Sequence, residues 1–330
     1  MTGLISSGAL ADLLQPDEGL ARHFNRPAFV WRGDLLAGGM GVKGLRFRRV
    51  VAELAGLGTT DLVVSGPPWS NAIRIAVKAA QPYGLRVHAV IELDTEVDSM
   101  SIDIGQGSIR DMVRQVERLV ASMHVAKTRS GLPIGIQARG IARKLNDQPG
   151  IRAVIADDLE TSRLWAEGMQ HLAGSIWRSA QRKCAVPAVV TPVGGGALLW
   201  ALMMAREHLG MDDASIIGYS VTYDKTQLRK RFKAFEYRAG IVEDHDVWAA
   251  GTTRVHSCPV ENPGSTVSAE MNSSSCVPVS YWDPVYHRGM LERLPNLALE
   301  LEPVSTPVII MTGVPQYDRD EFKRKTSGHT

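Results

Sequence analysis

Thr191 to Leu198 read TPVGGGAL, and this stretch decides the fold class because it joins a strand-like segment to a helix-like one. Residues 185–193 are mostly apolar and β-branched, whereas residues 197–209 repeat apolar side chains at helical spacing. Three successive glycines lack side chains, so their N–H groups can converge on an anion, which the dipole of the following helix also favours. A tight strand-to-helix turn without a ligand is the alternative that the loop alone leaves open.

The sequence of the loop excludes two kinds of phosphate ligand. The dinucleotide pattern GxGxxG is absent, because Leu199 stands where the third glycine belongs. No Lys-Ser or Lys-Thr pair follows, so the loop is not a nucleoside-triphosphate P-loop. A loop for one phosphate, without a ribose-binding acid nearby, suits a monophosphate such as pyridoxal phosphate.

Strand-like and helix-like segments alternate along the chain, which predicts an α/β fold of open, twisted, mainly parallel sheets flanked by helices. The expected strands span residues 27–31, 61–65, 86–93, 185–193, 215–221 and 308–311; the expected helices span residues 44–57, 71–83, 108–126, 159–181 and 197–209. Residues 250–282, rich in Ser, Thr, Gly, Asn and Pro, predict a long irregular segment. A length of 330 residues suggests two domains.

Composition excludes several classes of protein and of partner. Lys and Arg number 37 and Asp and Glu 35, so a net charge of +2 gives no electrostatic case for nucleic acid or an anionic membrane. Three cysteines without a CxxC pair form neither a disulfide framework nor a zinc site. No stretch reaches the roughly 18 apolar residues of a transmembrane helix, and Met1 to Leu14 lacks the features of a signal peptide. We therefore expect a cytoplasmic protein.

Two further segments carry candidate chemistry. In Leu35 to Phe47, LLAGGMGVKGLRF, glycines surround Lys43, whose amine could form an imine with an aldehyde cofactor; a solvated surface lysine is the alternative. In Ser65 to Arg74, SGPPWSNAIR, Ser70 could cap a helix whose first turn contains Asn71. The free N–H groups there would bind a carboxylate, unless the segment is an ordinary helix cap.

Together these motifs resemble the tryptophan synthase β superfamily of pyridoxal-phosphate enzymes (fold type II). Within it the chain is most similar to the 1-aminocyclopropane-1-carboxylate deaminase and D-cysteine desulfhydrase family. The similar segments are Gly33-Asp34, GMGVKGLRF around Lys43, PPWSN at residues 67–71, TPVGGGAL, DPVY at residues 283–286 and MTGVP at residues 311–315. The resemblance spans most of the chain and thins between residues 95 and 185.

The resemblance implies a role for each matching residue. Lys43 would hold pyridoxal 5'-phosphate and transfer protons. The cofactor phosphate would bind Gly194, Gly195, Gly196 and Ala197, and its ring would contact Asn71 and Thr312. Ser70 and Tyr286 would act on the substrate in a pocket that also contains Trp69 and His287. The resemblance also implies a homodimer, with residues 44–160 as a smaller domain inserted into a larger cofactor-binding domain of residues 1–43 plus 161–330.

The implied activity is deamination or β-elimination of a small amino acid, with proton transfer at Cα or Cβ. Two departures from the family motif put the substrate in doubt, because Pro67 and Pro68 replace glycines and Trp69 replaces a glutamine. A diverged biosynthetic enzyme that performs β-replacement or cyclisation is therefore an alternative. A non-catalytic homologue and a phosphate-binding protein without pyridoxal are two more.

Overall fold

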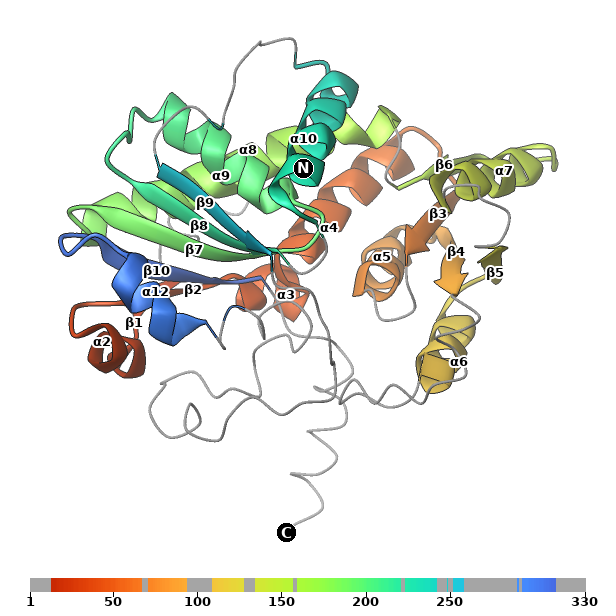
Figure 1. The fold of residues 1–330 in the computed structure, drawn as a ribbon. Helices are drawn as coiled ribbons and strands as arrows, with labels where there is room; N and C mark the ends of the chain where they lie inside the picture. Colours follow the sequence, from red (N-terminus) through yellow and green to blue (C-terminus); the bar gives the residue numbers. More distant parts are fainter. Residues whose placement is uncertain are drawn as a thin grey trace. The chain divides into compact units, whose positions relative to one another are not determined.

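The computed structural model describes residues 13–66, 71–93, 109–127, 134–156, 159–220, 223–241, 248, 252–257, 290 and 293–312. The chain divides into two compact units (Figure 1). The boundaries fall between Val42 and Lys43 and between Trp165 and Ala166, so that α4 (Gly41–Gly56) and α8 (Leu159–Lys183) each contain one of them. Among the described residues, unit 1 is formed by the segments before the first boundary and after the second, and unit 2 by the segment between them.

Unit 1 is built on a six-stranded sheet with the strand order β1-β2-β10-β7-β8-β9. Its strands are β1 (Leu14–Pro16), β2 (Phe29–Arg32), β7 (Pro187–Val193), β8 (Ser215–Ser220), β9 (Thr252–Ser257) and β10 (Thr306–Met311). Only β1 pairs antiparallel with its neighbour; the other pairs are parallel. All seven residues of β7 are buried, as expected for a central parallel strand that is covered on both faces.

Helices cover both faces of this sheet (Figure 1). On one face, α2 (Glu18–Phe24) and α12 (Leu294–Glu300) share a core cluster with side chains of β2, β7, β8 and β10. On the other face lie α8 and α9 (Ala197–His208), and the Trp177 indole of α8 donates to the Leu202 carbonyl of α9 at 2.8 Å. The remaining elements of this unit are η1 (Gly33–Leu35), α3 (Leu36–Gly39) and α10 (Lys225–Ala239).

Unit 2 contains a four-stranded parallel sheet with the order β5-β4-β3-β6. Its elements are β3 (Asp61–Gly66), β4 (Arg86–Leu93), β5 (Ser122–Lys127), β6 (Ala153–Ile155), α5 (Asn71–Ala80), η2 (Gln81–Tyr83), α6 (Ile109–Leu119) and α7 (Ile134–Asn146). Helix α7 buries Ala138 and Ala142 in one cluster with Val63 and Val90 of the sheet. Such small side chains let a helix lie close to a sheet.

The predicted α/β class with mainly parallel sheets is confirmed, but some predicted elements are wrong. A single helix was expected over residues 108–126, whereas α6 ends at Leu119 and Ser122–Lys127 is the edge strand β5. Within the predicted irregular segment 250–282, Thr252–Ser257 form the strand β9, and the other residues of the segment lie outside the described residues. The helical apolar spacing runs on through the start of β5, so periodicity alone could not separate the two elements.

Candidate functional site

The glycine loop lies at the carboxyl end of β7 and leads directly into α9. Gly196 is the N-cap residue of α9 with a φ of +88°, and no side chain caps the helix there. A Cβ atom on Gly196 would lie 2.8 Å from Phe232 Cε1 and 2.9 Å from Leu228 Cδ2. Both the backbone conformation and the available space therefore require glycine. Because the first N–H groups of a helix have no partner inside it, the start of α9 presents backbone donors that can bind an anion.

The loop lies where the strand order changes direction. From β7 the chain continues to β8 and β9 on one side, whereas β10 and β2 lie on the other side. These strands run parallel, so their carboxyl ends share one edge of the sheet. In open α/β sheets, ligands bind outside the carboxyl ends of the strands at such a point. The glycine loop thus occupies the position at which this fold class forms its binding sites.

Thr312 follows β10 at the same edge of the sheet and is half-buried. Its carbonyl oxygen accepts a hydrogen bond of 3.0 Å from the N–H of Val42. Lys43, the next residue along the chain, lies in the first turn of α4 and is half-buried. The backbone directly before the predicted cofactor lysine is therefore tied to the end of the strand that neighbours β7.

Gly33 and Asp34, the acidic dipeptide after β2, have a structural role. A Cβ atom on Gly33 would collide with the Met311 carbonyl oxygen and the Trp31 ring. The Asp34 carboxylate is fully buried and accepts two hydrogen bonds of 2.8 Å from the Arg32 guanidinium. A bidentate pair of this kind is geometrically specific. It fixes the turn from β2 into α3, the segment that leads to Lys43.

The structure describes only some of the other predicted site residues. Asn71 is the first residue of α5, directly after the segment that follows β3. Ser70 and Trp69, predicted beside it, lie outside the described residues, as do Tyr286 and His287. The structure thus groups the glycine loop, Ala197 and Thr312 at one sheet edge, and the roles of the remaining residues stay predictions.

Arg46 is a cation of α4 that no sequence motif indicated as a site residue. Its guanidinium stacks 4.4 Å from the centroid of the Trp165 ring. Burial lowers the pKa of Arg46 from its ordinary value to about 9, so the group stays charged at neutral pH. Arg46 follows Lys43 by three residues on one helix, which places the two side chains on neighbouring positions of one helical face.

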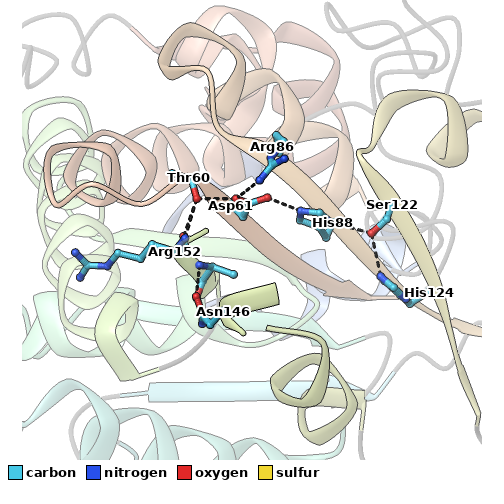
Figure 2. A network of polar contacts seen from close by, with 9 residues as sticks. Thr60, Asp61, Arg86, His88, Ser122, His124, Asn146 and Arg152 are labelled. Atoms are coloured by element: carbon cyan, nitrogen blue, oxygen red, sulfur yellow. Dashed lines mark hydrogen bonds and ion pairs between the residues drawn. The ribbon is translucent and has the colours of Figure 1, made fainter. Parts of the chain in front are cut away.

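A second polar cluster lies in unit 2, at the amino ends of its strands (Figure 2). Asp61 and Arg86 begin β3 and β4, and the Asp61 carboxylate accepts from Arg86 Nη2 at 2.8 Å and from Thr60 Oγ1 at 2.6 Å. His88 Nε2 lies 2.7 Å from Asp61 Oδ1, and His88 Nδ1 lies 2.7 Å from Ser122 Oγ. Ser122 Oγ in turn lies 2.9 Å from His124 Nε2. We call these six residues the Asp61 network.

The Asp61 network has the residue types of a catalytic site but the bonding of a structural one. Burial opposes ionisation of the Asp61 carboxyl, but the hydrogen bonds from Arg86, Thr60 and His88 outweigh it and hold its pKa below the ordinary value. Burial, together with the charges of His88 and Lys144, lowers the pKa of His124. The network lies at the amino ends of the strands, whereas ligands in this fold class bind at the carboxyl ends.

The fold and the position of the glycine loop define the class of structure: the chain has the fold of pyridoxal-phosphate enzymes of fold type II, as predicted. It is similar to an ACC deaminase homologue, with a TM-score of 0.66 and 14% identity over 96% of this chain and 92% of that one. It is also similar to Escherichia coli diaminopropionate ammonia lyase in apo form, with a TM-score of 0.60 and 13% identity over 100% of this chain and 89% of that one.

The T.th. threonine deaminase is a third similar structure, with a TM-score of 0.56 and 16% identity over 91% of each chain. The Escherichia coli ammonia lyase has also been solved in complex with an aminoacrylate-PLP azomethine reaction intermediate. At these identities the likeness is one of fold. No protein-family model matches the chain, and no curated protein matches it in sequence.

In the described part of the chain, no helix combines the length and apolar character needed to cross a membrane. Among the same residues, no group of three or more His, Cys, Asp or Glu side chains could hold a metal ion.

Proposed function

We propose that the chain binds pyridoxal 5'-phosphate and catalyses deamination or β-elimination of a small amino acid. The observation that carries the proposal is the glycine loop, whose Gly196 has neither the φ nor the space for a side chain. It stands at the carboxyl edge of a sheet whose fold is shared with solved deaminases and ammonia lyases. A homodimer acting on an amino-acid substrate is part of the proposal.

The residues at the loop fit the phosphate of this cofactor. A phosphate needs several convergent donors and a positive field, and the uncapped start of α9 offers backbone N–H groups and the positive end of a helix dipole. Gly194, Gly195, Gly196 and Ala197 would hold the phosphate. The hydroxyl of Thr312, at the end of the neighbouring strand, would lie at the pyridine nitrogen, and Asn71 would contact the ring.

The chemistry is divided between the cofactor and the chain. The bound cofactor would supply an electron sink for negative charge at the substrate α-carbon. Lys43 would anchor the cofactor and move a proton at that carbon. Ser70 would bind the substrate carboxylate, and Tyr286 would serve as the acid, base or nucleophile of the substrate pocket. General acid or base catalysis by a positioned side chain contributes roughly 10²–10⁴-fold.

The absorption spectrum of the purified protein tests cofactor binding directly. With pyridoxal phosphate added, we expect a band at about 410–430 nm from the bond to a lysine amine. Lys43→Ala should abolish this band, and mass spectrometry after borohydride reduction should find the cofactor on Lys43 alone. Lys78→Ala, which removes an exposed lysine of α5, is the control and should leave the band unchanged. A wild-type protein that takes up no pyridoxal phosphate would refute the proposal.

Product analysis tests the reaction class. Incubation with D-cysteine, aminocyclopropane carboxylate, D-serine and L-serine should release a 2-oxo acid and ammonia from at least one of them. A coloured protein that turns over none of the four would favour a diverged biosynthetic enzyme. The motif at Pro67, Pro68 and Trp69 is the sequence feature that motivates this second outcome.

A further inference from the structure

Arg231 of α10 lies at the glycine loop, although 36 residues separate it from Gly195. Its Nε donates a hydrogen bond of 3.4 Å to the Gly195 carbonyl oxygen. Its Nη2 lies 3.9 Å from the position that a Cβ atom of Gly195 would occupy. The guanidinium therefore faces the loop from the side on which the Gly195 carbonyl points.

The helix that carries Arg231 is fixed against the loop by apolar side chains. Leu228 and Phe232 are 0% and 3% exposed, and they fill the space that a Cβ atom on Gly196 would need. The start of the helix is also fixed, because Asp224 and Gln227 form a reciprocal capping box. Arg231 lies between the two apolar residues in the sequence, so the packing of α10 sets where its side chain begins.

The Arg231 side chain is oriented although it is exposed. Its guanidinium stacks over the Tyr223 ring at 4.4 Å from the centroid. The Tyr223 N–H donates to Ser220 Oγ at 3.1 Å, which ties this ring to the carboxyl end of β8. In the described part of the chain, no carboxylate forms an ion pair with Arg231. Among the described residues, its polar and ring contacts are with the Gly195 carbonyl and the Tyr223 ring.

The hydrogen bond to the Gly195 carbonyl also sets the direction of the Gly196 N–H. In a trans peptide the C=O and the following N–H point in opposite directions, and the described chain contains no cis peptide bond. A donor that holds the Gly195 carbonyl therefore turns the Gly196 N–H to the opposite side. Glycine backbones rotate freely, so without such a contact this peptide would sample other directions.

We propose that Arg231 is a positioning residue that holds the Gly195–Gly196 peptide with the Gly196 N–H directed at the cofactor phosphate. This inference rests on the proposed function, since it concerns the phosphate of the same cofactor. It adds a side chain to a loop whose own residues, three glycines and an alanine, offer only backbone donors. Arg231 acts from behind the loop, through the peptide, and does not itself touch the phosphate.

Replacements of Arg231 that separate hydrogen bonding from charge test the proposal. Arg231→Met removes both, Arg231→Gln keeps a neutral N–H donor, and Arg231→Lys keeps a donor and the charge. Lys230→Met is the matched control, because it removes the adjacent exposed cation of the same helix. For each full-length variant we would measure the dissociation constants of pyridoxal phosphate and of pyridoxal, and the ³¹P chemical shift of the bound phosphate.

We expect Arg231→Met to weaken pyridoxal phosphate binding about tenfold, which corresponds to one hydrogen bond to a charged group. Pyridoxal, which lacks the phosphate, should bind all variants equally. The ³¹P shift should move in Arg231→Met and stay near the wild-type value in Arg231→Lys and Lys230→Met. The tenfold loss should not depend on salt concentration, because the guanidinium does not pair with the phosphate.

Three results would overturn the inference. Equal affinities in wild type and Arg231→Met would show that the contact has no role in binding. Equal losses in Arg231→Gln and Arg231→Met, with a loss that shrinks at high salt, would show that Arg231 acts directly by its charge. A wild-type protein that binds neither pyridoxal phosphate nor pyridoxal would refute the proposed function itself, whereas the first two results require a wild type that binds the cofactor and leave that function standing.

Discussion

Two sheet edges differ in their polar groups: the carboxyl edge of the sheet in unit 1 and the amino edge of the sheet in unit 2. At the first edge, the glycine loop has few polar side chains, and its helix begins without a side-chain cap. At the second edge, Asp61, His88 and Ser122 form a chain of hydrogen bonds of 2.7 Å that resembles a catalytic triad in composition. The edge with the more reactive residue types is the one we assign to stability.

The difference lies in which donors remain available to a ligand. In the Asp61 network each polar group bonds to another one: with a proton on His88 Nε2, His88 donates to Asp61, Ser122 donates to His88 and His124 donates to Ser122. A buried polar group that is bonded in this way stabilises the fold and has no donor left for a substrate. The glycine loop instead presents backbone N–H groups at a helix start that no side chain caps. We therefore expect the ligand site at the glycine loop, where backbone N–H groups remain available to a ligand.

Asp61→Asn should lower stability strongly and leave cofactor binding unchanged. The fully buried carboxylate accepts three hydrogen bonds, so its loss should lower the free energy of unfolding by about 3 kcal/mol. The lower end of the usual range applies because the Arg86 side chain is 53% exposed and can be solvated without its partner. Chemical denaturation measures this effect. Asp147→Asn, an exposed carboxylate after α7, is the control and should change stability by less than about 0.5 kcal/mol.

The same variant tests the comparison between the two edges. Below its melting temperature, folded Asp61→Asn should bind pyridoxal phosphate with the wild-type dissociation constant. A variant that stays stable but loses the cofactor would mean that the Asp61 network belongs to the functional site.

Gly196→Ala should lower both the stability of the fold and its affinity for the cofactor. The left-handed backbone costs about 1–2 kcal/mol for a residue with a Cβ atom, and the contacts with Phe232 and Leu228 add an overpacking cost of about 1–3 kcal/mol. A shift of the loop should also weaken pyridoxal phosphate binding by about tenfold or more, because the backbone donors then move. Isothermal titration and denaturation of the same preparation measure both quantities.

Gly210→Ala is the matched control for this substitution. Gly210 has a φ of +62° at the end of α9, but open space surrounds its Cβ position. The variant should lose about 1 kcal/mol of stability and keep its affinity for the cofactor. If both variants lose affinity equally, a general effect on α9 rather than the geometry of the loop explains the result.

The features that the sequence predicted best are those encoded within a short segment of the chain. TPVGGGAL identified a strand, a loop and a helix because the three elements follow one another within a short segment. The fold class followed from the alternation of such segments. By contrast, β5 was missed because it is an edge strand with little polar alternation, where Met123 and His124 are both half-buried. The burial of an edge strand depends on the elements that pack over it, and the strand's own sequence does not specify them.

Contacts between distant segments could not be predicted. The Asp61 network depends on the register that pairs Asp61 with Arg86 and His88 with Ser122, and a shift by one residue would move these side chains to the other face. Arg231 stood in a basic run, KTQLRKRFK, that gave no sign of which cation meets the loop. The signal that could have found it is helical spacing, since Leu228 and Phe232 mark the buried face of α10 and Arg231 lies at its border.

The dependence of stability on pH gives the smallest of these effects, and it distinguishes the two ends of the Asp61 network, the His124 imidazole and the Asp61 carboxyl. Because the folded protein holds the pKa of His124 below its ordinary value, the unfolded chain binds a proton more readily at this residue. Stability should therefore decline as the pH falls below about 6.5, the ordinary pKa of histidine. The Asp61 carboxyl also has a lowered pKa, so its contribution is present above about 3.9 and is lost as the pH falls through the folded value.

Urea denaturation between about pH 8 and about pH 3 should resolve these two declines. His124→Gln keeps a hydrogen-bonding group near Ser122 but cannot titrate. It should therefore remove the decline that begins at about pH 6.5 and leave the decline caused by the Asp61 carboxyl. His208→Gln, which replaces an exposed histidine at the end of α9, should leave both declines unchanged. If the first decline persists in His124→Gln, a group other than His124 binds that proton, and the assignment of the decline to this end of the Asp61 network is wrong.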